Sequence, residues 1–191
     1  MSGIMKAFSW FDPSSITDDE IASEISVNFT AQAILSRHFL LFLESKAKSG
    51  KPATLILVSS GLAYVPPPPG PGGASYNGAK SAVHPMALAM RQEINRSDDE
   101  TFRKNLHIIE LAPPYVATDL DIEFRDNFKG GHPPMPLKDF IDDAMDEFGK
   151  VDENGKPLKE IAVGFSELGV SLWRGSIGKK MEEMGFGCGR L

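Results

Sequence analysis

The sequence of 191 residues is 41% hydrophobic and 24% charged, with a formal net charge of −6 at pH 7. That length suits a single folded domain over residues 1–191, and an acidic balance without a basic block argues against nucleic acid as a partner. The single cysteine, Cys188, excludes a disulfide framework and predicts a reducing, cytoplasmic compartment. The apolar run at 38–43 is too short to span a bilayer, so no membrane partner is expected.

The first predicted element is a long helix over residues 17–50. Thr17 and Glu20 have the spacing of a capping box, and acidic residues fill the first turn, where the helix dipole favours negative charge. Apolar residues then recur at helical spacing, at Ile21, Ile25, Phe29, Leu35, Phe39 and Leu43. This pattern predicts an amphipathic helix that ends at Gly50.

A strand and a second helix follow. Residues 54–60 contain four consecutive apolar residues between turn signals, which indicates a strand covered on both faces. A loop rich in proline and glycine occupies 64–73, and residues 74–96 have a helical pattern. Pro85 lies inside that pattern, and we expect a kink there because proline has no backbone N–H to donate.

The second half of the chain repeats the alternation. A strand is predicted at 106–111, an amphipathic helix at 136–150, a short strand at 159–166 and a last helix from about 171 to 184. The acidic residues at 98–100 are interpreted as a solvated loop. Strands that alternate with helices predict an α/β fold, in which parallel strands are joined by right-handed crossovers.

Tyr76 and Lys80 stand four residues apart at the start of the second predicted helix, so they share one of its faces. A phenol is a poor base at neutral pH, but a nearby ammonium favours the phenolate and lowers its pKa. Such a pair can move a proton to or from an alcohol or carbonyl oxygen. By itself, however, this spacing is more often an ordinary helix pair without a chemical role.

Three other polar residues add context to that pair. Ser60 ends the first predicted strand and Thr118 follows the second, and the carboxyl ends of parallel strands meet at one edge of a sheet. Asn28 lies inside the first long helix, where asparagine is unfavourable unless its amide has a partner. Four separate segments therefore direct polar side chains towards one region.

With these motifs the sequence resembles the short-chain dehydrogenases/reductases. The resemblance rests on four ordered stretches: SVNFTAQAILSRHFL, LILVSSGLAYVP, YNGAKSAVH and IIELAPPYVATDL. It implies the C-terminal part of a Rossmann-type, doubly wound parallel sheet, with about three strands and flanking helices. It also implies hydride transfer between NAD(P) and a small-molecule carbonyl or alcohol.

The resemblance assigns roles residue by residue. Tyr76 would be the general acid/base, Ser60 would bind the substrate oxygen, and Asn28 would position a water that relays protons to Lys80. Lys80 would also hold the nicotinamide ribose and lower the pKa of the tyrosine. Tyr76 and Lys80 would thus contact the cofactor as well, together with Val116 and Thr118.

The sequence departs from the family pattern at the phosphate-binding turn. No strand is followed by T-G-x-x-x-G-x-G, and the glycines at 70–73 and 185–189 are interpreted as plain loop glycines. We therefore expect a chain shortened at its N-terminus, in which NAD(P) binding is weak or lost. The strand at 54–60 would then be an exposed edge of the sheet.

Three interpretations stay open. The first is an oxidoreductase whose activity is impaired in this shortened chain. The second is a non-catalytic protein that pairs with a full-length relative, or with itself, through the two long helices. The third is a truncated gene model.

Several residues have less specific explanations. Trp10, Phe11 and Trp173 suit a substrate pocket or core packing, and His38 and His84 suit packed or surface positions. No spacing typical of a metal site appears among the histidines.

Overall fold

The structure is a computed structural model that describes residues 3–65, 73–123, 125 and 133–185. Its sheet has three parallel strands in the order β1-β2-β3, namely β1 (Ala53–Val58), β2 (Leu106–Ala112) and β3 (Glu160–Ala162). Ala53 pairs with Leu106 at one end of the β1–β2 ladder, and Glu110 pairs with Glu160 where β3 joins. The predicted α/β class and the parallel strand directions are confirmed.

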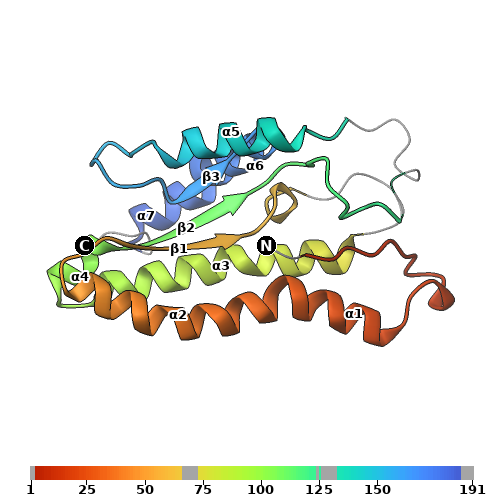
Figure 1. The fold of residues 1–191 in the computed structure, drawn as a ribbon, viewed down its shortest axis with the longest axis horizontal. Helices are drawn as coiled ribbons and strands as arrows, with labels where there is room; N and C mark the ends of the chain where they lie inside the picture. Colours follow the sequence, from red (N-terminus) through yellow and green to blue (C-terminus); the bar gives the residue numbers. More distant parts are fainter. Residues whose placement is uncertain (1–2, 66–72, 124, 126–132, 186–191) are drawn as a thin grey trace.

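The helices form a layer on each side of the sheet (Figure 1). On one side lie α1 (Asp18–Ile25), the π-helical turn η2 (Ser26–Thr30), α2 (Ala31–Lys48), α3 (Ala74–Arg96) and the short α4 (Glu100–Asn105). On the other side lie α5 (Leu137–Phe148) and α6 (Phe165–Trp173), and α6 continues through the π-helical turn η5 (Arg174–Gly178) into α7 (Lys179–Glu183). The 3-10 turns are η1 (Pro13–Ser15) and η3 (Gly61–Ala63).

Strand β2 is the centre of the core because both of its faces are covered. Ile108 packs with the buried residues Leu57 and Val83 against α2 and α3, whereas Ile109 packs with Ile161 against α5. Successive side chains of a strand point to opposite faces, so the continuous apolar run of β2 supplies both clusters.

Strand β1 is an edge strand of the described sheet, as the sequence predicts. The side chain of Ile56 is 46% exposed. At the last residue of the strand, a side-chain amide satisfies the backbone: Val58 N–H donates to Gln32 Oε1 at 3.0 Å, and Val58 O accepts from Gln32 Nε2 at 3.1 Å. Capping by Gln32 therefore protects only the carboxyl end of this edge.

Three local expectations are corrected. The third strand is shorter than 159–166, and the last helical segment begins at Phe165 rather than near 171. The acidic run is not a loop throughout, because Asp99 caps α4 by accepting from Phe102 N–H at 2.9 Å. Helix α3 continues through Pro85, which is exposed.

Other expectations lie outside the described residues. They concern Cys188, most of the Pro/Gly loop (66–72) and the glycines at 186–189. Within the described ranges, no helix combines the length and the apolar character needed to cross a membrane.

Candidate active site

Tyr76 and Lys80 lie in the first two turns of α3, on the face that packs against the sheet. Their side chains are largely buried, since Tyr76 is 7% exposed and Lys80 is 4% exposed. The Lys80 Nζ stands 5.8 Å from the centroid of the Tyr76 ring. The i, i+4 spacing thus brings the ammonium close to the aromatic ring, as the sequence suggests.

Ser60 approaches this pair from the end of β1. After the strand, Ser59 N–H donates to Leu111 O at 2.9 Å and Gly61 N–H donates to Pro113 O at 2.9 Å, so the chain stays in register with the end of β2. The Ser60 Oγ caps η3 by accepting from Leu62 N–H at 3.2 Å. The Ser60 side chain also lowers the pKa of the Tyr76 phenol, so Ser60, Tyr76 and Lys80 come together at the carboxyl end of β1.

The electrostatics of the pair differ from the sequence expectation. Burial raises the pKa of Tyr76, and the carboxylate of Glu24 raises it further, while the hydrogen bond with Ser60 acts in the opposite direction. The net pKa of the phenol is therefore raised, and no lowering by Lys80 is seen. Burial lowers the pKa of the Lys80 ammonium from 10.5 to about 8.

The Lys80 ammonium binds the backbone at the edge of the sheet. Its Nζ donates to Val58 O at 3.1 Å, the same carbonyl that accepts from Gln32. An ammonium has three N–H donors, so this bond leaves donors for other acceptors.

Asn28 lies in the π-helical turn η2, where the helix bulges between α1 and α2. The residue is fully buried, and its Nδ2 donates to Ile4 O at 2.6 Å. Its Oδ1 has no hydrogen-bond partner and faces Gly3, where an added Cβ would come within 3.1 Å. The hydrogen-bond partner expected for this mid-helix amide is thus the N-terminal segment. The π-helical turn is a second indication, since such turns are frequent at functional sites.

Val116 and Thr118 follow the end of β2. Val116 is half-buried and forms a bridge to Met135, while Thr118 is exposed and accepts from Leu120 N–H at 3.4 Å. Neither side chain hydrogen-bonds Ser60, Tyr76 or Lys80 within the described residues. The structure therefore brings three of the predicted site residues together and links Asn28 to them through the N-terminal segment, while Val116 and Thr118 share no described hydrogen bond with them.

Sequence reasoning missed Glu24, which is fully buried beside the cluster. Its Oε1 accepts from Lys6 N–H at 2.7 Å, and its Oε2 accepts from the Ser75 hydroxyl, in the residue before Tyr76. A signal was present, because Glu24 precedes Asn28 by four residues and so shares its side of the helix.

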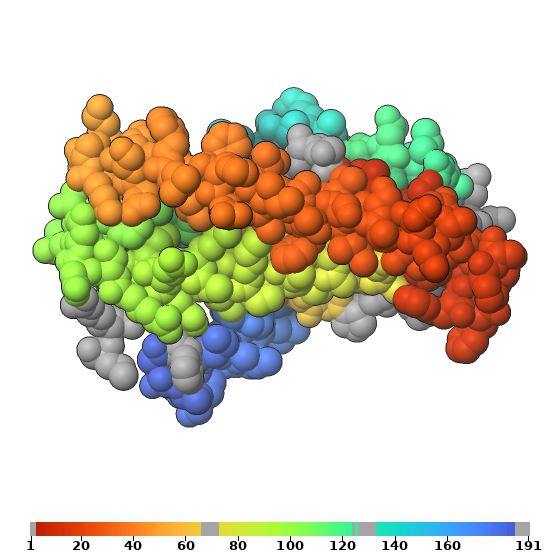
Figure 2. Space-filling view, turned by 90° about the horizontal axis from the view of Figure 1, so that it is seen from below, coloured from red at the N-terminus to blue at the C-terminus, as the bar shows by residue number. Residues whose placement is uncertain are grey.

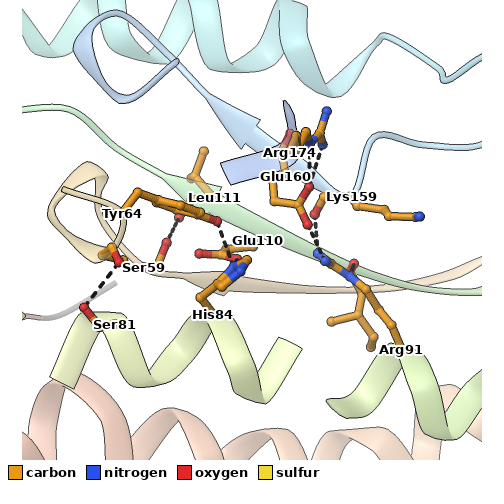
Figure 3. Close-up of polar contacts among 12 residues, drawn as sticks. Ser59, Tyr64, Ser81, His84, Arg91, Glu110, Leu111, Lys159, Glu160 and Arg174 are labelled. Carbon is orange, nitrogen blue, oxygen red and sulfur yellow. Dashed lines mark hydrogen bonds and ion pairs between the residues drawn. The ribbon is translucent and has the colours of Figure 1, made fainter. Parts of the chain in front are cut away.

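A second buried network lies behind the cluster, where α3 crosses β2 (Figure 3). His84 Nδ1 is 2.9 Å from the Tyr64 hydroxyl and 2.6 Å from Glu110 Oε2. The ring of His84 also meets the edge of Trp173, with ring centroids 4.4 Å apart. His84 and Trp173 are therefore packed residues, one of the two alternatives for each.

Further along α3, Arg91 crosses to β3. Its Nη1 pairs with Glu160, and its Nε donates to Ile108 O at 2.9 Å. Arg174 binds the other oxygen of Glu160 through its Nε at 2.7 Å (Figure 3). These bonds fix α3, and with it Tyr76, against the middle of the sheet.

Among the described residues, no group of His, Cys, Asp and Glu side chains could hold a metal ion. A hollow of about 300 Å³ lies between residues 62–65 and the start of α3. Trp10 and Phe11 are not among the residues that line it, and their exposure of 68% and 98% rules out core packing for both.

Comparisons with known proteins agree with this geometry. A family model described as short chain dehydrogenase matches residues 6–129. The uncharacterized oxidoreductase DltE of Bacillus subtilis (strain 168) is 33% identical over 103 residues, which cover 54% of this chain and 35% of that protein.

The fold is also similar to solved structures. One is a short chain dehydrogenase from Burkholderia cenocepacia J2315 in complex with NADP (TM-score 0.65, 16% identity, 96% of this chain and 65% of that chain). Another is a 3-ketoacyl-(acyl-carrier-protein) reductase from Brucella melitensis complexed with NADH (TM-score 0.63, 19% identity, 86% of this chain and 64% of that chain). The chain thus spans about a third of the curated relative and less than two thirds of these structures.

Proposed function

The chain belongs to the short chain dehydrogenase family, and from that premise we propose that it serves hydride transfer between NAD(P) and a carbonyl or alcohol of a small molecule. The arrangement of Ser60, Tyr76 and Lys80 at the carboxyl end of β1 carries the proposal. A buried phenol with a serine hydroxyl and an ammonium beside it can donate a proton to a substrate oxygen.

Each side chain has one task in this proposal. In the reducing direction the Tyr76 phenol donates its proton to the substrate oxygen, while the Ser60 hydroxyl hydrogen-bonds the same oxygen as it gains charge. Lys80 supplies positive charge beside the phenolate that results. The free Oδ1 of Asn28 accepts from a water on the route by which the phenol regains its proton. A nicotinamide cofactor supplies or accepts the hydride.

The described residues fit the nicotinamide ribose of such a cofactor better than its pyrophosphate. Lys80 has free N–H donors for ribose hydroxyls beside Tyr76. The sequence has no strand followed by a T-G-x-x-x-G-x-G turn, the pattern that holds a pyrophosphate in this family. We therefore propose that this 191-residue chain alone binds NAD(P) weakly and that its activity is impaired. Val116 and Thr118 remain proposed cofactor contacts.

Turnover with NADPH and a panel of aldehydes and ketones, at saturating cofactor, tests the proposed reaction. Tyr76→Phe removes the proton donor and should lower the rate at least about 100-fold. Tyr115→Phe is the matched control, because its hydroxyl is bonded to Asp121 away from the cluster. Equal rates for the two variants would refute the role of Tyr76.

Binding is measured separately, by titrating the purified chain with NADPH and following nicotinamide fluorescence. Weak binding predicts no saturation at micromolar cofactor. Micromolar affinity would overturn the proposed impairment but not the reaction.

A second candidate function is a non-catalytic one, pairing with a full-length family member. The observation that favours it is an apolar surface on α2, where Ile34, Leu35, Phe39, Leu41 and Phe42 are all exposed. Figure 2 shows α2 at the surface alongside α3. Exposed apolar groups of this kind mark interaction sites.

Size-exclusion chromatography with light scattering tests the pairing, on the chain alone and co-expressed with a full-length relative. Phe42→Glu should weaken the association, and Ile177→Glu in η5 is the control at an equally exposed apolar residue. A monomer under both conditions would refute this function.

Two broader proposals accompany these functions. Residues 1–191 form one domain, because β2 joins the cores on both faces of the sheet. The compartment is the cytoplasm, which suits a sequence with one cysteine.

A further inference from the structure

The start of α3 lacks a cap of its own. The N-cap residue is Gly73, which has no side chain to accept from the first backbone N–H groups. Glycine suits this position because φ is +79°, in the left-handed region that other residues rarely adopt. The helix that carries Tyr76 therefore begins without the usual local anchor.

Glu24 supplies an anchor from another helix. Its carboxylate accepts from the Ser75 hydroxyl in the first turn of α3 and, at 2.7 Å, from Lys6 N–H. Negative charge near a helix N-terminus is favourable because of the helix dipole. A buried carboxylate needs such donors, since burying an unpaired charge is strongly unfavourable.

The N-terminal segment is held between these elements. Ile4 O accepts from Asn28 Nδ2 at 2.6 Å, and Lys6 O accepts from Gly73 N–H at 3.3 Å. Glu24 and Asn28 thus bind the segment from α1 and η2, while Gly73 binds it from the start of α3. Glu24 is the residue that contacts both the segment and the first turn of α3.

We propose that Glu24 is a positioning residue for Tyr76: its carboxylate ties the first turn of α3 and the segment at Lys6 to α1, and so fixes where the phenol stands. Tyr76 directly follows Ser75, so any displacement of that turn moves the phenol relative to Ser60. The effect of Glu24 on catalysis rests on the proposed function, whereas its effect on the position of α3 does not.

The carboxylate has a second effect through its charge. The groups facing the phenol are Ser60 from the end of β1, Lys80 from α3 and Glu24 from α1. A negative charge beside a phenol disfavours the phenolate, so Glu24 raises the pKa of Tyr76, whereas Ser60 lowers it. Removing the charge of Glu24 should therefore lower the pH at which Tyr76 ionises.

Glu24→Gln tests this, because glutamine can still accept from Lys6 N–H and donate to the Ser75 oxygen. Phenolate absorbance is followed with pH, and the Tyr76 component is obtained by subtracting the same titration with Tyr76→Phe added. We expect its midpoint to fall. Glu93→Gln, at an exposed position of α3, is the matched control and should leave the midpoint unchanged.

An unchanged Tyr76 midpoint in folded Glu24→Gln would overturn the effect assigned to its charge. Ser75→Ala tests the anchor itself: amide hydrogen exchange should rise several-fold in the first turn of α3, and unchanged exchange there would overturn the proposal. Neither measurement needs cofactor or substrate, so an inactive chain refutes the proposed reaction and leaves this result intact. In an active chain, the alkaline side of the pH–rate profile should shift together with the titration midpoint of Tyr76.

Discussion

Replacing Lys80 by methionine should stabilise the chain at neutral pH, although Lys80 belongs to the proposed catalytic group. The Lys80 side chain is buried, and its ammonium has one described acceptor, Val58 O at 3.1 Å. Burial lowers the pKa of that ammonium from 10.5 to about 8, so the folded state disfavours its charge. Methionine keeps the length and apolar stem of lysine without that charge.

The magnitude follows from the pKa. The fall from 10.5 to about 8 means that holding the proton at pH 7 costs the folded state about 3 kcal/mol, at about 1.4 kcal/mol per pH unit. Losing the hydrogen bond to Val58 O costs about 1 kcal/mol, and Gln32 still donates to that carbonyl. Lys80→Met should therefore raise the free energy of unfolding by about 2 kcal/mol.

The pH dependence has a defined sign. Between about pH 8 and pH 10.5 the unfolded chain keeps the Lys80 proton while the folded chain has lost it. The unfolded state then binds more protons, so the stability of the wild-type chain rises with pH in this window. Lys80→Met lacks this contribution, and its advantage over wild type should shrink as the pH rises.

Urea denaturation at pH 7 and pH 10, followed by circular dichroism, measures both effects. Lys138→Met is the control, because that lysine is 82% exposed and its charge should have little effect on stability. The reasoning is refuted if Lys80→Met is less stable than wild type at pH 7, or if the difference between them is the same at both pH values. A stabilised but inactive variant would show a functional residue maintained at the expense of stability.

Two further predictions concern stability. Glu160→Gln should lower the free energy of unfolding by about 3 kcal/mol at pH 7, because the buried guanidinium of Arg91 loses its partner. Burial raises the pKa of Glu160 but Arg91 and Arg174 outweigh it, so in urea denaturation the loss should diminish as pH falls through the lowered pKa. Asp99→Ala should lower stability by about 1 kcal/mol through loss of the α4 cap, with faster hydrogen exchange at Phe102; unchanged exchange would contradict the cap.

The sequence determined the parts of this protein that depend on local patterns. The capping box of Thr17 and Glu20 begins α1 where the spacing predicts it, and the apolar runs of β1 and β2 form parallel strands. The helical spacing of Tyr76 and Lys80 puts both on one face of α3. The cap at Asp99 was also readable, since it too depends on neighbours in the chain, but the acidic run concealed it.

Only the tertiary structure decided which distant groups meet. Glu24 and Ser75 are 51 positions apart, and Arg91 and Glu160 are 69 apart, so no local spacing relates them. The same holds for the pKa of Tyr76, which the sequence predicts to be lowered by its neighbour Lys80. Burial and Glu24 raise it instead, because the surroundings of a buried charge are set by how the layers pack, while a helix face is set by the helix alone.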